Sequence, residues 1–206
     1  PKTLGSIYSN LGGVLYESGD LVEGEKCVRK SIEIFDLGGK PINLSISYCH
    51  LALIYLQTNQ IEQAAHETQL SIHYANMDDF RRGKAVGKLL QAEIEAHRGN
   101  KQEAEVLVDQ GLEDFGKLGI VEGLNLEQAG RTHRLLGNME RAESYFLRGI
   151  EVSEDFPVYY AALYVELASV LKSQGRADWS EKLQKAMEIY RKVECPLRIE
   201  ILKKQF

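Results

Sequence analysis

The sequence predicts an all-α fold in which about five helix–turn–helix units stack into a solenoid and a further C-terminal helix follows. Three observations predict it: a short turn that recurs along the 206 residues, small residues at fixed distances from that turn, and apolar residues at helical spacing between turns. Self-similarity at a fixed period of some tens of residues is the signature of repeat architectures.

The recurring turn has Gly or Asn at its centre. The central residues are Gly19, Asn59, Gly99, Gly137 and Gly175, so successive turns lie 40, 40, 38 and 38 positions apart. Gly and Asn adopt the left-handed conformation more readily than other residues, and a helix that ends where the chain reverses commonly needs that conformation. Each turn is therefore predicted to join two antiparallel helices.

Small residues indicate where the two helices of each unit cross. One lies seven positions before each turn (Gly12, Ala52, Ala92, Gly130 and Ala168) and another lies five positions after it (Gly24, Ala64, Ala104, Ala142 and Ser180). Small side chains allow two helix backbones to approach closely.

Apolar residues place the helices themselves. The first helix of a unit carries large apolar residues on one face, for example Tyr8, Leu11 and Leu15, at the spacing of an amphipathic helix. The second helices are expected over Leu21–Phe35, Ile61–Tyr74, Lys101–Phe115, Met139–Val152 and Asp178–Val193, each followed by Gly, Asp or Pro residues. A lone helix pair cannot bury both of its faces, so the pairs are expected to stack.

We expect a single solenoid domain over residues 1–206, with repeats at about 5–44, 45–84, 85–122, 123–160 and 161–195 and a capping or truncated helix at 196–206. The sequence begins without Met and stops within a helical pattern, which indicates a segment of a longer protein. If residues 196–206 begin another repeat, the uncovered end predicts a homodimer through the solenoid ends.

These units resemble the tetratricopeptide repeat. The residues that carry the resemblance are Tyr8, Leu11, Gly12, Leu15, Gly19, Gly24, Val28 and Ser31 in the first unit, Tyr48, Leu51, Ala52, Tyr55, Asn59, Ala64, Thr68 and Ser71 in the second, and Gly130, Gly137, Ala142, Phe146 and Gly149 in the fourth. The third unit departs from the pattern, with Lys88, Gln91 and Glu95 where apolar residues are usual.

The long period resembles the branch of this family found in kinesin light chains and bacterial regulatory arrays. The resemblance implies a right-handed α-α superhelix, a non-enzymatic role and a protein or peptide partner bound on the inner face. It places these residues on that face: Tyr16, Ile46, Cys49, Leu53, Leu56, Leu89, Glu93, His97, Glu127, Arg131, Arg134 and Lys172.

Two interpretations of these inner residues stay open. The apolar ones favour the apolar side of an amphipathic helix as partner, with Arg131, Arg134 and Lys172 paired to acids on it. Alternatively, leucines at such positions belong to the core between repeats, and surface arginines are merely solvated.

Composition excludes several other function classes. A formal net charge of −5 argues against direct binding of nucleic acid or an acidic membrane surface, both of which require a positive field. Cys27, Cys49 and Cys195 are odd in number and widely spaced, so a reducing cytoplasm is expected rather than a disulfide framework.

The sequence shows no assembled chemistry, so we expect no catalysis, cofactor or metal. His66 and His73 share a helix face but lack a third ligand at a recognisable spacing. Cys49 and His50 are adjacent on a helix, and adjacent side chains do not face each other.

The leading hypothesis is a scaffold for a protein or peptide, as a segment of a larger cytoplasmic signalling protein. The alternative is a switch in which a short peptide or small molecule tightens the superhelix and regulates an attached domain.

Overall fold

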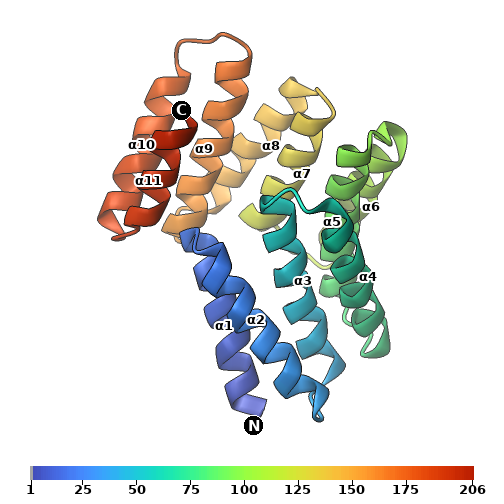
Figure 1. The fold of residues 1–206 in the computed structure, drawn as a ribbon. Coiled ribbons are helices and arrows are strands. Elements are labelled where there is room, and N and C mark those ends of the chain that lie inside the picture. The colour runs from blue at the N-terminus through green and yellow to red at the C-terminus, as the bar shows by residue number, and fades with distance from the viewer. Residues whose placement is uncertain (1) are drawn as a thin grey trace.

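The structure, a computed structural model, describes residues 2–206, and this range forms eleven α-helices. They are α1 (Lys2–Ser18), α2 (Leu21–Asp36), α3 (Pro41–Gln57), α4 (Ile61–Met77), α5 (Arg81–Arg98), α6 (Lys101–Lys117), α7 (Gly123–Leu135), α8 (Met139–Val152), α9 (Pro157–Ser173), α10 (Trp179–Lys192) and α11 (Pro196–Gln205). Helices α1 to α10 pack as five successive antiparallel pairs, and α11 follows them (Figure 1). The predicted all-α repeat fold is therefore confirmed.

The turn residues adopt the backbone conformation that the sequence predicts. Gly19, Asn59, Gly99, Gly137 and Gly175 all have positive φ, between 58° and 91°. At each of them the chain leaves the first helix of a pair and enters the second. Because glycine meets no side-chain penalty there, and asparagine meets less than most residues, the spacing of these residues fixes where the helix pairs form.

The small residues lie where paired helices touch. A Cβ atom on Gly12 would come 2.3 Å from Val28 Cγ2 in the partner helix, and one on Gly130 would come 2.4 Å from Phe146 Cε1. No real side chain tolerates such distances, so glycine is what allows these two pairs to pack closely.

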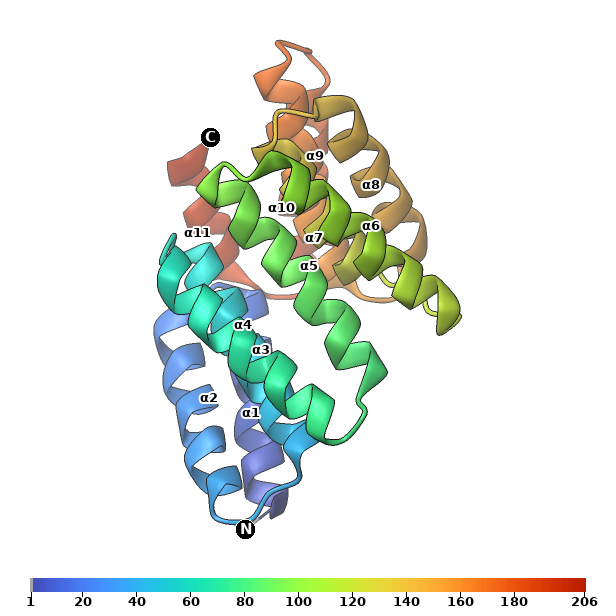
Figure 2. The same ribbon diagram turned by 90° about the vertical axis from the view of Figure 1, so that its right-hand side faces the viewer.

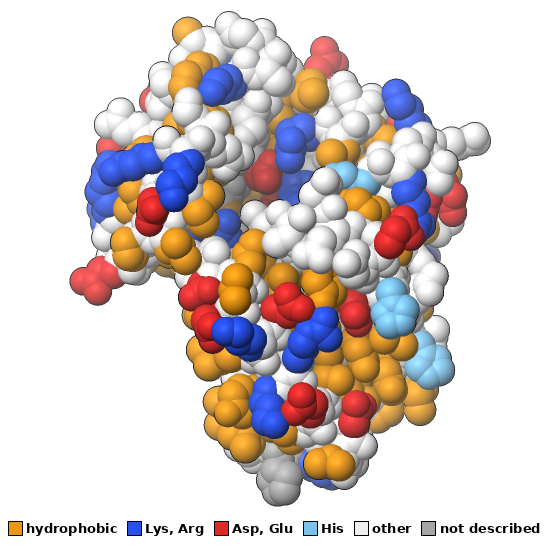
Figure 3. Space-filling model, viewed as in Figure 1, with side chains coloured by type: hydrophobic (Ala, Val, Ile, Leu, Met, Phe, Trp, Pro, Cys, Tyr) orange, Lys and Arg blue, Asp and Glu red, His pale blue; other side chains and the backbone are white. Residues whose placement is uncertain are grey.

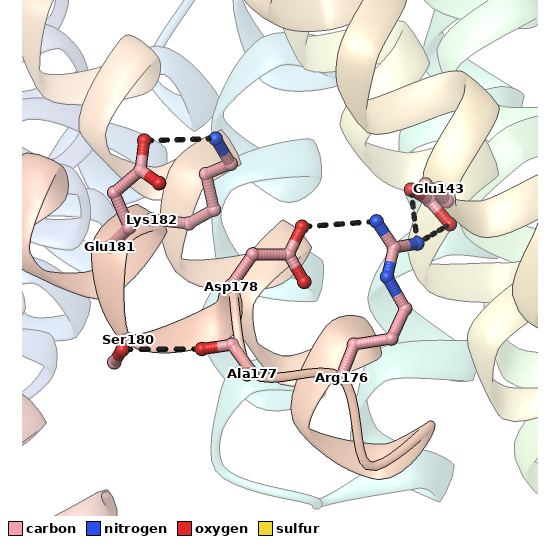
Figure 4. Close-up of polar contacts among 7 residues, drawn as sticks. All are labelled: Glu143, Arg176, Ala177, Asp178, Ser180, Glu181 and Lys182. Carbon is pink, nitrogen blue, oxygen red and sulfur yellow. Dashed lines mark hydrogen bonds and ion pairs between the residues drawn. The ribbon is translucent and has the colours of Figure 1, made fainter.

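The fifth pair departs from the others at its turn. Helix α10 begins at Trp179, one residue later than predicted, because the connection after α9 is longer. Arg176 holds this connection by donating to both carboxylate oxygens of Glu143 on α8, at 2.7 and 2.9 Å, and to Asp178 at 3.0 Å (Figure 4). The turn is thereby tied to the preceding repeat.

The two ends of the array meet. Helix α11 packs on α9 and α10 through Leu202 and Phe206, and its first turns lie against the C-terminal end of α1 (Figures 1 and 2). Arg198 donates to the carbonyl oxygens of Glu17 and Tyr16 at 2.7 and 2.8 Å. These carbonyls have no partner inside α1, since they belong to its last turn, and they carry the negative end of the helix dipole.

This closure encloses part of the inner face of the superhelix. Successive helix pairs turn relative to one another until the last pair reaches the first (Figure 2). No helix within residues 2–206 has both the length and the apolar character needed to cross a membrane.

Candidate functional site

The closed inner face contains a cavity of about 120 Å³ between the two ends of the array. We call it the polar cavity; its wall includes Tyr16 and Glu17 from α1, Glu127, Arg131 and Arg134 from α7, Tyr159 and Glu166 from α9, Tyr190 from α10 and Arg198 from α11. Figure 3 shows acidic and basic side chains inside a hollow between the C-terminal helices and the middle of the array. Charged groups on an inner face are expensive to bury, so their pairing decides what the cavity offers.

A second space of about 200 Å³ adjoins the polar cavity. We call it the apolar pocket; its wall includes Ile46, Cys49, Leu53, Phe80, Val86 and Leu124. Tyr16, Glu17 and Tyr159 line both spaces. The inner face therefore presents a charged space and an apolar space side by side.

Two of the three arginines in the polar cavity form ion pairs with glutamates. Arg131 lies 2.7 Å from Glu93 of α5, and the two side chains are 12% and 1% exposed. Their contact is that of an ion pair rather than of a linear hydrogen bond. Arg134 lies 3.2 Å from Glu166 of α9. Attraction between such charges is strong away from water, which offsets part of the cost of burying them.

Glu127 is the buried acid without such a partner. Its residue is 8% exposed, and burial, opposed by the positive charge of Arg131, raises the pKa of its carboxyl from 4.5 to about 7. Burial also raises the pKa of Glu17, whose carboxyl accepts a hydrogen bond from Tyr159, and it raises the pKa of Tyr16 to about 12. Near neutral pH the Glu127 carboxyl is thus close to its midpoint of ionisation.

The structure brings seven of the predicted residues together. Tyr16, Glu127, Arg131 and Arg134 line the polar cavity, and Ile46, Cys49 and Leu53 line the apolar pocket. Glu93 lies behind Arg131, and His97 is exposed at the end of α5.

The prediction that Leu56 and Leu89 offer contacts to a partner is wrong. Leu89 is fully buried against Phe115 of α6, and Leu56 is buried within the largest hydrophobic cluster. Leu56 therefore belongs to the core that joins repeats, and Leu89 belongs to the core of its own helix pair.

The structure gives Arg131 and Arg134 acids within the chain, whereas the sequence predicted that they pair with acids on a partner. Both pair with glutamates of the chain itself. Lys172 lies outside the cavity wall, with its Nζ 4.9 and 5.0 Å from the ring centres of Trp179 and Phe206. There it fastens the end of the chain to α9 and α10.

Sequence reasoning missed Tyr159, Glu166 and Arg198. The first two lie on α9 among the other residues of that helix that line the cavity, Val158, Ala162, Val165 and Ser169, and no sequence motif distinguished them. Arg198 had no signal, because its role depends on the closure between α11 and α1.

Other chemistry finds no support in the site. Burial raises the pKa of the Cys49 thiol to about 12 and lowers that of His50 to about 4, so neither is activated for nucleophilic catalysis. In the part of the chain that the structure describes, no cluster of three or more His, Cys, Asp or Glu residues has a geometry that could hold a metal ion.

The closure predicts a measurable effect of Arg198→Ala. This variant leaves the carbonyls of Tyr16 and Glu17 without their charged donor, so we expect a loss of about 1.5 to 3 kcal/mol in unfolding free energy and a larger radius of gyration. Urea unfolding and small-angle X-ray scattering measure the two quantities. Arg191→Ala, at an exposed position on α10, is the control. Identical scattering from both variants would show that Arg198 does not hold the ends together.

Two segments of the chain, residues 3–67 and residues 126–156, match family models described as tetratricopeptide repeat. The fold is similar to that of BtubC (BKLC) from P. vanneervenii, with a TM-score of 0.56 and 18% identity over 93% of this chain and 82% of that one. It is also similar to the TPR-like repeats of a putative kinesin light chain from Podosopora anserina, with a TM-score of 0.52 and 16% identity over 94% of this chain and 97% of that one. No curated protein matches the chain.

Proposed function

We propose that this chain, in which residues 3–67 and 126–156 match tetratricopeptide repeat models, is a non-enzymatic scaffold that binds a segment of a protein or peptide on the inner face of its superhelix. The observation that carries this proposal is the pair of adjoining spaces, one charged and one apolar, with Tyr16, Glu17 and Tyr159 in the wall of both. A segment with two suitable neighbouring side chains fills both spaces at once.

The volumes of the two spaces limit which part of a partner can enter them. Volumes of about 120 and 200 Å³ hold individual side chains and not a whole segment. The backbone of the partner therefore lies along the opening, and two of its side chains point inward. Such anchoring gives specificity through the side chains, as in other modes of peptide recognition.

The closure of the array supports a second candidate function. A partner that separates α11 from α1, or that binds only while they touch, changes the shape of the whole array. The domain then acts as a ligand-responsive switch for an attached part of a larger cytoplasmic signalling protein. Scattering measured with and without a bound peptide separates the two functions, because a simple scaffold keeps its radius of gyration.

The test uses peptides selected on the immobilised wild-type domain from a random display library. Ile46, partly exposed and in the wall of the apolar pocket, is changed to Arg, and Val22, which is exposed on α2, is changed to Arg as the control. Selected peptides should bind wild type and Val22→Arg alike and should bind Ile46→Arg at least about tenfold more weakly, a loss of about 1.4 kcal/mol. Peptides that bind all three proteins equally would place binding elsewhere, and an empty selection would contradict the scaffold.

A further inference from the structure

The three arginines of the polar cavity already have partners within the chain. Arg131 pairs with Glu93, Arg134 pairs with Glu166, and Arg198 caps the carbonyl end of α1. A partner that brings an acid to this cavity has to compete with these contacts. Breaking one of them leaves a glutamate or the carbonyl end of α1 without its charged partner, which is unfavourable away from water.

Not all glutamates of the polar cavity have a charged partner within the described residues. Within residues 2–206, the Glu127 carboxylate has no ion pair or hydrogen-bond donor, although its residue is more than nine-tenths buried and lines the cavity. Glu17 has one neutral donor, the hydroxyl of Tyr159. The cavity and its immediate shell thus hold three arginines and four glutamates, which leaves one negative charge uncompensated when all four carboxyls are ionised.

The remaining wall suits a cation. Tyr16, Tyr159 and Tyr190 line the same cavity, and aromatic rings attract cations that have lost their water. A volume of about 120 Å³ accommodates the end of one long side chain, since it is several times the roughly 10 to 15 Å³ that one water molecule needs in the same measure.

We propose that the polar cavity receives the cationic end of an Arg or Lys side chain of the partner segment, with the Glu127 carboxylate as its counter-charge. The proposal rests on the proposed function and adds the charge of the ligand to it. The adjoining apolar pocket then takes a neighbouring apolar side chain of the same segment. The recognised motif is a basic residue next to an apolar one.

Binding by this route depends on pH. The groups that face Glu127 or act on its charge are Arg131, Glu93, Glu166, Arg198, Tyr16, Tyr159 and Tyr190, from six different helices. Below its pKa of about 7 the Glu127 carboxyl holds a proton and offers no charge to a cation. A basic segment should therefore bind more tightly as the pH rises from about 6 to about 8.

The experiment uses four pools of random hexapeptides that differ only in one fixed central residue, which is Arg, Lys, Gln or Glu. All peptides are acetylated and amidated, so that the fixed side chain is the charge under test; random positions exclude charged residues. Binding is measured by fluorescence anisotropy against wild type, Glu127→Gln and the control Glu151→Gln, which changes an exposed acid on α8.

The Arg and Lys pools should bind wild type and Glu151→Gln at least about tenfold more tightly than the Gln pool. This preference should be lost in Glu127→Gln and should shrink at pH 6. Gln is close in shape to Glu, and circular dichroism checks that the variant is folded.

The four pools distinguish a failure of the cation proposal from a failure of peptide binding itself. If the Gln or Glu pool binds wild type as well as the Arg pool does, the cation proposal is overturned while peptide binding stands. If no pool binds, peptide binding on the inner face is overturned, and the cation proposal with it. A Gln pool with a free amino terminus that matches the Arg pool would assign the cation to the end of the partner chain and overturn the side-chain assignment.

Discussion

Replacing Arg131 by Met is expected to lower the free energy of unfolding by about 3 to 5 kcal/mol. The guanidinium lies 2.7 Å from Glu93, whose side chain is 1% exposed. Methionine fills similar space but removes the charge, so the variant leaves a carboxylate buried between α5 and α7 without a counter-charge. Urea unfolding followed by circular dichroism measures the loss.

Arg176→Met provides a matched control for this prediction. Arg176 also pairs with a glutamate at 2.7 Å, but its side chain is 44% exposed, so we expect a loss below about 1 kcal/mol. The double variant Arg131→Met/Glu93→Leu removes both charges and should regain most of the stability. If Arg131→Met costs no more than Arg176→Met, the inner ion pair is not isolated from water as the structure indicates.

The repeat architecture was predictable from the sequence because it rests on local signals. Turn residues with positive φ and small residues at helix crossings act within one helix pair, and their spacing along the chain locates them. Four of the five second helices begin at the predicted residue, and the fifth differs by one position because its turn is longer.

The third unit shows a case in which the local sequence pattern did not indicate the tertiary contact. Lys88, an unusual residue for its position, lies 2.6 Å from Asp114 on α6. An ion pair thus stands in the place that apolar packing takes in other pairs. The sequence showed the departure, but the partner residue became apparent only once the two helices were placed.

The site was only partly predictable because it depends on the whole array. Whether Leu89 faces a partner or the core of its own helix pair depends on helix rotation, which a register assignment defines only to within a residue or two. The contact between Arg198 and α1 depends on the sum of small rotations over five pairs. Neither the rotation of a helix nor the closure of the array is encoded in a local pattern. Both determine which charged side chains of the cavity lack a partner.

Glu127→Gln is expected to stabilise the protein by about 3 kcal/mol at pH 8 and by less than about 1 kcal/mol at pH 5. Burial raises the pKa of the Glu127 carboxyl from 4.5 to about 7 in the folded state, so the folded protein holds this proton over a pH range in which the unfolded chain has released it. A proton bound more tightly in the folded state stabilises it at low pH, and that contribution is lost as the pH rises through 4.5 toward 7. At pH 8 the folded wild type contains an unfavourable buried charge, which the neutral amide of Gln removes.

Urea unfolding of wild type, Glu127→Gln and the exposed control Glu151→Gln at pH 5 and pH 8 measures this difference. Equal stability of the first two proteins at both pH values would contradict an isolated charge on Glu127. The same free energy links stability to binding: a cation that enters the polar cavity relieves the charge that destabilises the empty protein above pH 7. A basic peptide should therefore raise the unfolding free energy of wild type more at pH 8 than at pH 5, and in Glu127→Gln its effect should be small at both.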